Sequence, residues 1–302
     1  MSGPCKKLRL SGYLALDVSS VSLRVSVSTC SQCPIKGYEL RGVNSFKRGL
    51  PRLLMSGRAI KVEALESATG LIELYRHGDY AFKWALLEGR APYSLEAGKE
   101  AVIACLREQC VIEAGTWRVE LSPKDLLYLT GSANLTLEGR GSLVVIGEAP
   151  SERSQIRLVK RFNELSRLTS GLEGYRRDVY VALGEADPSD RLMAGFTEGW
   201  PGEWTSFPPH KHDDKVEIYV YYGLNGGYGL QVVEDHDGVD VFKVRDYDAV
   251  IIVRGYHPNV ATPNSRICYL WILCQVEGRK SMRVEFQPGF EKLPLGTTHL
   301  SR

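Results

Sequence analysis

The chain has 302 residues, of which 43% are hydrophobic and 25% charged, and its formal net charge is +2. These values are ordinary for a globular protein and the length is ample for two domains, so disorder over the whole chain is excluded. No block of lysine and arginine predicts a basic face, and we expect neither DNA nor RNA as a partner. The sequence has no run of roughly 18 apolar residues and no secretory signal pattern, which predicts a cytoplasmic protein that does not bind membranes.

Residues 1–54 differ from the rest of the chain because they are rich in serine and contain many more basic than acidic residues. Such a segment is a poor core former, so we expect a dispensable N-terminal extension, with Met55 as a candidate start. Cys30-Ser-Gln-Cys33 has the spacing of half a zinc knuckle, but no second pair or nearby histidine completes it. The seven cysteines are an odd number and do not predict a disulfide framework. We interpret Cys30 and Cys33 as incidental thiols.

The segment from Glu63 to Tyr75 has a broken apolar face at helical spacing and predicts a helix. Strand signals then dominate. They are short, rich in β-branched residues and bounded by turns, as in a β-sandwich or barrel. This first set of predicted strands comprises residues 101–106, 110–113, 116–121, 125–130, 133–137 and 142–146.

A polar connector without apolar rhythm, Pro150-Ser-Glu-Arg-Ser-Gln155, is the predicted linker to a second set of strands. The sequence therefore predicts two all-β units in tandem, at residues 55–150 and 151–290, followed by a tail at 291–302. The second set of predicted strands comprises residues 178–183, 191–196, 216–222, 229–233, 239–244, 249–253 and 267–273.

The two units share one phrase of sequence. Residues 125–133 and 248–257 both run from an aspartate through an apolar strand to a glycine and a second strand, if one residue is gapped. We interpret this as an internal duplication in which Ala133 stands where His257 stands.

Residues suited to metal binding gather in Pro208-Pro-His-Lys-His-Asp-Asp-Lys-Val-Glu217. Residues two apart on a strand point to the same face, so His210 and His212 can offer two imidazoles to one point, and Glu217 can add a carboxylate from the next strand. A carboxylate that opens an apolar strand needs a compensating charge. With His257 as a fourth ligand, this set suits Zn²⁺ or Mn²⁺, with Fe²⁺, Co²⁺ or Ni²⁺ as alternatives.

The order of these residues resembles the two motifs of the cupin superfamily: HxH, four residues and a glutamate, then a later Gly-x-His. Within that superfamily, PPHKHD and RGYHP resemble the 5-deoxy-glucuronate isomerases of inositol catabolism and the related 5-keto-4-deoxyuronate isomerases of pectin breakdown. The resemblance implies two cupin barrels (double-stranded β-helix, jelly-roll), a metal at His210, His212, Glu217 and His257, and aldose–ketose isomerisation of a small-molecule sugar acid. A cupin Fe²⁺ dioxygenase and a non-catalytic sugar-binding cupin stay open as alternatives.

Candidate substrate and catalytic residues surround the predicted ligands. Tyr219 and Tyr221 share the strand face of Glu217 by the period of two, so they are expected to line the cavity, in the core, in catalysis or both. The general base stays open among Glu203, Asp213 and Tyr256, with Tyr221 as a further catalytic candidate. The candidates for substrate binding are Lys211, Gln231, Arg254 and Tyr219.

The first unit contains no HxH pair and no histidine between residues 78 and 209. We therefore expect it to bind no metal. Its expected role is packing, formation of a homo-oligomer, or covering of the pocket.

Overall fold

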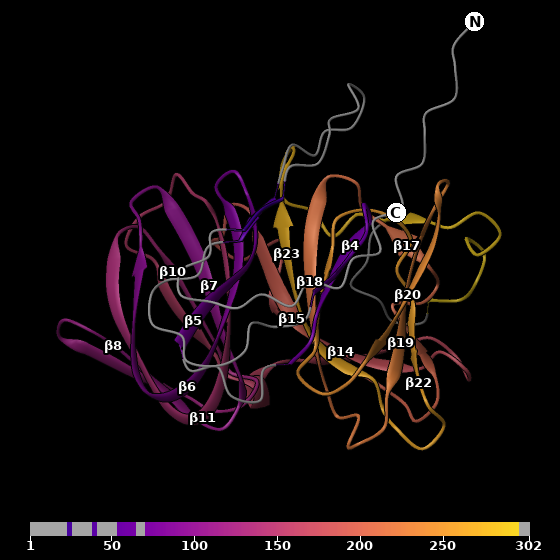
Figure 1. Cartoon of the computed structure of the whole chain (residues 1–302), viewed down its shortest axis with the longest axis horizontal. Helices are drawn as coiled ribbons and strands as arrows, with labels where there is room; N and C mark the ends of the chain where they lie inside the picture. Colours follow the sequence, from indigo (N-terminus) through magenta and orange to yellow (C-terminus); the bar gives the residue numbers. More distant parts are fainter. Residues whose placement is uncertain (1–22, 26–37, 41–52, 65–69, 296–302) are drawn as a thin grey trace, which may run out of the picture.

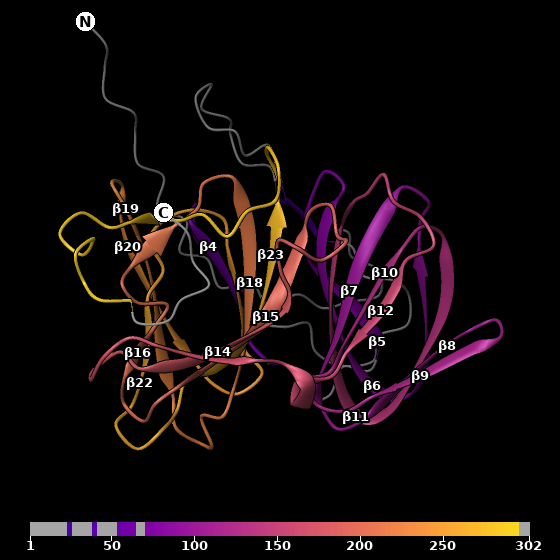
Figure 2. The same ribbon diagram turned by 180° about the vertical axis from the view of Figure 1, so that it is seen from behind.

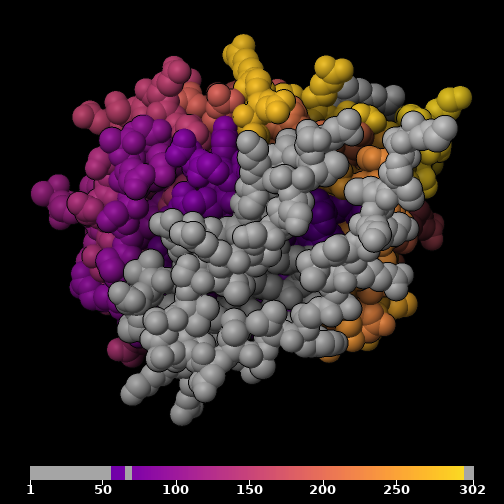
Figure 3. All heavy atoms as spheres, turned by 45° about the horizontal axis from the view of Figure 1, so that its top comes forward, coloured from indigo at the N-terminus to yellow at the C-terminus, as the bar shows by residue number. Residues whose placement is uncertain are grey.

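The protein is described by a computed structural model covering residues 23–25, 38–40, 53–64 and 70–295. Within this part of the chain the fold is nearly all β, with 24 strands and one short 3₁₀ helix, η1 (Phe162–Glu164). Figures 1 and 2 show two β units side by side, the first in magenta and the second in orange and yellow. The same two units are distinguished by colour on the face shown in Figure 3.

The first unit is built on one eight-stranded sheet in the order β12-β10-β7-β11-β6-β5, in which β8 also pairs with β11 and β9 pairs with β8. Two long antiparallel strands, β6 and β11, run through its whole height. The strands are β5 (Gly70–His77), β6 (Tyr80–Leu95), β7 (Lys99–Arg107), β8 (Cys110–Ala114), β9 (Trp117–Leu121), β10 (Leu126–Thr130), β11 (Ala133–Pro150) and β12 (Arg157–Lys160).

The second unit pairs an eight-stranded sheet, in the order β13-β14-β15-β23-β18-β21-β4-β3, with a four-stranded sheet, β16-β22-β19-β20. A separate short pair joins β17 to β24. These strands are β3 (Leu53–Met55), β4 (Ala59–Val62), β13 (Arg167–Ser170), β14 (Arg177–Leu183), β15 (Leu192–Gly199), β16 (Trp204–Thr205), β17 (His210–Lys211), β18 (Lys215–Tyr222), β19 (Gly229–Asp235), β20 (Gly238–Val244), β21 (Ala249–Ile252), β22 (Asn259–Ala261), β23 (Cys268–Gln275) and β24 (Glu285–Phe286).

Strand alternation separates the two faces of the second unit's large sheet. In β18, Val216, Ile218 and Val220 pack in the apolar cluster between the two units, which also contains Trp84 and Leu126 of the first unit. The intervening residues face the interior of the second unit, where Tyr219 and Tyr221 join a separate cluster. Because residues two apart share a face, the same alternation that builds the core also aims Glu217 into the interior.

Each unit contains one strand from the part of the sequence that was predicted to belong to the other unit. β4 precedes the first unit in sequence but pairs with β21 of the second, and β12 follows the predicted linker but pairs with β10 of the first. Strand pairing therefore crosses the division expected at residues 150–155. The two units are consequently interleaved through two short segments.

The turns before β10 and β21 are hydrogen-bonded alike. Asp125 and Asp248 each accept a bond from the backbone N–H three residues earlier, at 3.1 and 3.0 Å. Their second oxygens accept bonds from Phe162 at 3.0 Å and Ala64 at 2.8 Å, each two residues beyond an exchanged strand. We propose on this basis that the two units are a duplicated cupin barrel, with Ala133 in place of His257.

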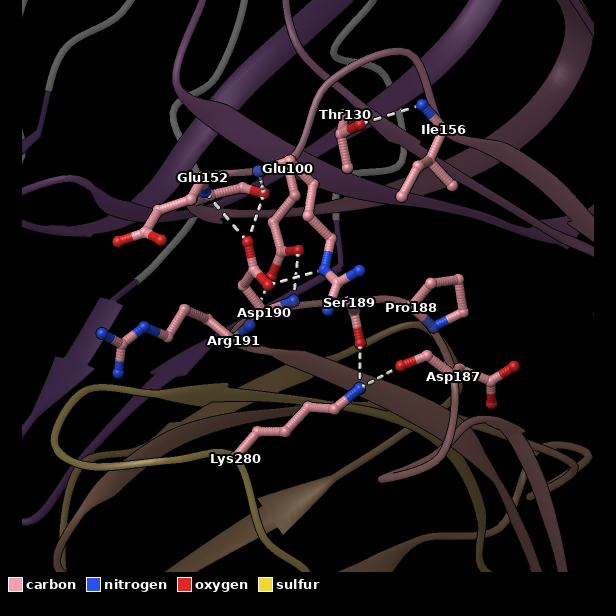
Figure 4. A network of polar contacts seen from close by, with 12 residues as sticks. Glu100, Thr130, Glu152, Ile156, Asp187, Pro188, Ser189, Asp190, Arg191 and Lys280 are labelled. Atoms are coloured by element: carbon pink, nitrogen blue, oxygen red, sulfur yellow. Dashed lines mark hydrogen bonds and ion pairs between the residues drawn. The ribbon is translucent and has the colours of Figure 1, made fainter.

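A buried polar cluster fastens the units together, as Figure 4 shows. Glu100 on β7 is fully buried, and its carboxylate accepts bonds from the backbone N–H groups of Asp190, Arg191 and Leu192 at 2.7 to 2.8 Å. Lys280 approaches the same turn and binds Ser189 at 2.6 Å. Because these donors and acceptors satisfy one another out of water, the turn before β15 is fixed against the first unit.

The predicted helix over Glu63–Tyr75 is wrong where the structure describes it, since β5 begins at Gly70. A β-bulge between Glu73 and Tyr75 disrupts the alternation of β5 against β6. Leu74 and Tyr75 are therefore both buried although they are neighbours. With the bulge, apolar side chains three and four residues apart in the sequence can both be buried in a strand. The same spacing suggests a helix when only the sequence is read.

Most of the expected N-terminal extension, including Cys30 and Cys33, lies outside the described residues. Within it the structure describes β1 (Leu23–Val25), β2 (Tyr38–Leu40) and β3, and β3 pairs with β4. No helix in the described part of the chain is long and apolar enough to cross a membrane.

Candidate metal centre

Three separated segments bring the predicted ligands together. His210 lies on the short strand β17, His212 follows it in a turn, and Glu217 lies on β18. His257 arrives from the loop between β21 and β22, and its backbone N–H binds the carbonyl of His210 at 3.3 Å. The backbone therefore fixes the distant histidine next to the HxH segment.

The side chains of His212, Glu217 and His257 converge on one point. The Nε2 atoms of His212 and His257 lie 3.0 and 3.4 Å from Oε2 of Glu217, and one ligand atom from each residue falls within 4.8 Å of the others. All three side chains are buried. His210 lies outside this group of three but packs beside it, with 4.9 Å between its ring centroid and that of His257.

Backbone carbonyls orient two of the imidazoles. Nδ1 of His257 lies 2.8 Å from the carbonyl oxygen of Gly255, and Nδ1 of His210 lies 3.0 Å from that of Pro208. A carbonyl only accepts hydrogen bonds, so Nδ1 carries the proton in both rings and Nε2 keeps its lone pair. This is the arrangement typical of histidines that ligate a metal through Nε2.

Two buried ring nitrogens, Nδ1 of His212 and Nε2 of His257, have no hydrogen-bond partner. Buried polar atoms almost always have a hydrogen-bond partner. Two ring nitrogens without one, beside an ionised carboxylate, therefore fit a site that binds a ligand. Imidazole nitrogens and one carboxylate are donors for a borderline divalent cation. The residues present therefore fit a metal ion.

The charges of the group also suit a cation. Burial by itself would raise the pKa of Glu217, but the hydrogen bond with His212 and the nearby imidazole of His257 lower it to about 2, so the carboxylate is ionised. Burial lowers the pKa of His210 well below its usual 6.5, with His257 adding to the effect. His210 is therefore neutral near pH 7, the form in which imidazole binds metals.

A pocket opens against these ligands inside the second unit. Tyr219 and Tyr269 stack beside it with ring centroids 4.2 Å apart, and the Tyr219 hydroxyl lies 3.2 Å from that of Ser206. Burial raises the pKa of both tyrosines, so their hydroxyls keep their protons. The lining residues are Arg177, Thr197, Ser206, His210, His212, Lys215, Glu217, Tyr219, Tyr269, Trp271, Leu273, Ser281, Met282, Arg283 and Val284.

Gln231, predicted to bind substrate, lies behind the ligands rather than among the lining residues. Its side chain is fully buried, and its Nε2 donates to the carbonyl oxygen of His257 at 2.8 Å. Its Oε1 accepts bonds from Tyr221 at 2.7 Å and Asn259 at 3.0 Å. The contacts of Gln231 and Tyr221 are those of residues that position His257.

The other predicted residues are not among those that line the pocket. Lys211 and Tyr256 share Glu285, with Lys211 also binding Asp213 at 2.7 Å. Arg254 pairs with Asp235 and Asp237, and Glu203 accepts a bond from Nε of Arg176 at 2.8 Å. Of the predicted catalytic and substrate residues, Tyr219 is the one that lines the pocket.

Sequence reasoning missed Arg177, Thr197 and Tyr269. A signal for Arg177 was present, because Arg177, Val179 and Val181 alternate on β14 and a charged residue thus opens an otherwise apolar strand face. The same argument identified Glu217. Thr197 and Tyr269 carry no distinguishing signal, since both residue types are common in β cores.

The amino-acid sequence matches a known protein family. The sequence profile of the KduI/IolB family matches residues 82–293, which contain all four candidate ligands. The chain belongs to the KduI/IolB family. The resemblance found in the motifs PPHKHD and RGYHP is thereby confirmed.

Relatives in this family include two 5-deoxy-glucuronate isomerases. That of Geobacillus kaustophilus is 31% identical over 114 residues, which are 34% of this chain and 41% of that protein. That of Halalkalibacterium halodurans is 28% identical over 165 residues, 50% of this chain and 60% of that protein. The matched stretches thus span about half the length of these curated relatives.

Solved structures share the fold. An IolB-like protein from Salmonella typhimurium has a TM-score of 0.68 at 18% identity, covering 76% of this chain and 97% of its own. The oxalate decarboxylase of Bacillus subtilis, which has Mn(II) centres, has a TM-score of 0.51 at 10% identity and covers 79% of each chain. The predicted all-β cupin fold is confirmed.

Proposed function

We propose that this protein is a metal-dependent aldose–ketose isomerase that converts 5-deoxy-glucuronate to 2-deoxy-5-keto-gluconate. The observation that carries the proposal is the convergence of buried His212, Glu217 and His257 on a pocket in a KduI/IolB family member. The relatives named 5-deoxy-glucuronate isomerase favour this substrate over 5-keto-4-deoxyuronate.

His210, His212, Glu217 and His257 would hold one divalent ion, Zn²⁺ or Mn²⁺. When bound, such an ion supplies Lewis acidity, which acidifies the C–H bond next to a carbonyl and stabilises the enediolate. Gln231 would keep His257 in place through its carbonyl oxygen. Glu217, ionised and buried, would neutralise part of the ion's charge.

Tyr219 is positioned to act on the substrate itself. It lines the pocket two residues after Glu217 on β18, and its raised pKa keeps the hydroxyl protonated. A protonated phenol donates a hydrogen bond, so we assign Tyr219 to a substrate oxygen rather than to proton abstraction. Catalytic roles for Glu203, Tyr221 and Tyr256 remain predictions.

The test is a substrate panel with the metal-loaded, full-length protein. Zn²⁺- and Mn²⁺-loaded samples would be incubated with 5-deoxy-glucuronate, 5-keto-4-deoxyuronate and glucuronate, and the appearance of ketose signals followed by ¹³C NMR. We expect turnover of 5-deoxy-glucuronate that is lost on chelation and restored by metal. Turnover that survives complete metal removal, or turnover of none of the three acids, would contradict the proposal.

A further inference from the structure

Arg177 is a buried cation that faces the pocket. It opens β14 and is 3% exposed, and it lines the same pocket as Glu217 and Tyr219. Alternation along β14 places Val179 and Val181 on the same face, and Val181 packs against the apolar cluster inside the second unit. The guanidinium is therefore enclosed in the interior rather than at the surface.

No carboxylate pairs with Arg177 among the described residues. The one hydrogen bond of its guanidinium to these residues runs from Nη1 to the carbonyl oxygen of Tyr175, at 3.4 Å. The neighbouring ionisable groups are Tyr219, Tyr269 and Tyr175, and burial lowers the pKa of Arg177 itself. A buried arginine is normally paired, and here the charge faces a cavity instead.

Two other cations line the pocket and differ from Arg177. Lys215 is buried, but its Nζ binds Asp214 at 2.7 Å. Arg283 is exposed, so water solvates its charge. The preceding residue, Arg176, binds Glu203. Arg177 is thus the buried lining cation whose charge is left for a ligand.

Resting on the function proposed above, we infer that Arg177 binds the carboxylate of the sugar acid. In a six-carbon uronic acid the carboxylate is at the opposite end of the chain from the aldehyde. Isomerisation turns that aldehyde into a primary alcohol while the neighbouring C–OH becomes the ketone. β14 and β18 are three strands apart in the sheet, roughly 14 Å when measured along the sheet. Arg177 and Glu217 therefore reach into the pocket from well-separated strands, as a ligand with two distant polar ends requires.

The planar guanidinium explains why this residue is arginine. It can donate two parallel hydrogen bonds to one carboxylate, and it keeps its charge when buried. A bound carboxylate would also supply the counter-charge that the described residues lack. Arg177 would in this way select acids over neutral sugars, while the histidine end carries out the reaction.

The experiment compares Arg177→Met and Arg177→Lys with wild type, using full-length, metal-loaded protein. For Arg177→Met we expect kcat/KM with 5-deoxy-glucuronate to fall about 100-fold or more, mainly through KM, with metal content unchanged. With the neutral analogue in which the carboxylate is reduced to an alcohol, wild type and variant should be alike. Arg177→Lys keeps the charge and should recover part of the loss. Arg167→Met, an exposed arginine on the neighbouring β13, is the matched control.

Binding of gluconate, measured by calorimetry, separates the two proposals. If wild type turns over no uronate yet binds gluconate, and Arg177→Met does not, the isomerase proposal fails and this inference stands. Unchanged KM and gluconate binding in Arg177→Met overturn the inference, as does a loss that follows Arg283→Met instead. Wild-type protein that neither turns over a uronate nor binds gluconate overturns both the proposed function and this inference. Should Arg177→Met misfold, Arg177→Lys and its preference for acid over alcohol decide the question.

Discussion

Single buried residues give the site its chemistry, and His257 is the one that arrives from farthest in the sequence. His257→Ala, like the same change at His210 or His212, should remove most bound metal and nearly all isomerase activity while leaving the fold largely intact. The reason is that strand packing does not use these imidazoles, whereas the ion needs them. Metal analysis and far-UV circular dichroism check this.

His236→Ala is the control for these variants, because the His236 side chain is 83% exposed and should be neutral in both assays. Glu217→Ala should be equally inactive but should retain weak metal, since three imidazoles still hold a borderline cation. A metal-loaded, active His257→Ala variant would contradict the assignment of the centre.

Acid should weaken the metal-free protein through the same residues. The folded-state pKa of His210 is lowered by burial, so the unfolded chain binds more protons below pH 6.5. This contribution to stability is therefore full above pH 6.5 and is lost as pH falls toward the lowered pKa. Glu217 adds a second loss between its usual 4.5 and about 2.

We expect the free energy of unfolding to decrease from pH 7 to pH 4, measured by urea denaturation of metal-free protein. His210→Phe should show a shallower decrease over the same interval, since the aromatic shape is kept and the titrating group removed. Equal slopes for wild type and His210→Phe would show that His210 does not titrate in this way.

At the scale of elements, β7 holds the turn before β15 through one side chain. Glu100→Gln replaces a carboxylate oxygen by an amide, which confronts a backbone N–H donor with another donor. Burial raises the pKa of Glu100, so removing its charge relieves a desolvation cost. Losing each charge-assisted hydrogen bond destabilises the protein by more than this relief. We expect a loss of about 2 kcal/mol in urea unfolding, with metal content unchanged.

Glu96→Gln is the matched comparison for this element, because the Glu96 side chain is 75% exposed and pairs with Lys99 at the surface. Exposed pairs contribute little, so its effect on the free energy of unfolding should be much smaller than that of Glu100→Gln. Equal stabilities of the two variants would mean that the junction does not depend on Glu100.

At the scale of the whole molecule, the exchanged strands make the two units depend on each other. A chain beginning at Met55 keeps β4 intact and should be soluble and active. A chain beginning at residue 63 loses β4, whose Ala59, Ile60 and Val62 are buried, and exposes the edge of β21. An exposed apolar edge promotes aggregation.

Size-exclusion chromatography of the two shortened chains checks this difference. We expect the longer one to elute as folded protein with wild-type metal content and the shorter one to aggregate. Aggregation of the chain that begins at Met55 would show that residues before it are required for folding.

Features that repeat over a few residues could be predicted from the sequence alone. Period-two alternation predicted the strand of Glu217 and the face it shares with Tyr219, and HxH spacing brought His210 and His212 to one place. A bulge in β5 breaks that local rule, which is why a helix was predicted there. Local period fixes the face of a side chain because the backbone geometry of a strand does so, whatever lies opposite.

Which residues lie opposite each strand face depends on the packing of distant segments. Arg177 and Glu217 reach one pocket because β14, β15, β23 and β18 lie in that order, which no local pattern encodes. The exchange of β4 and β12 likewise depends on which sheet edge each strand finds. Gln231 contacts His257 rather than the pocket, because its amide donates a hydrogen bond to the carbonyl oxygen of His257, 26 residues away. Such contacts form between distant segments, so they depend on the packing of the whole chain.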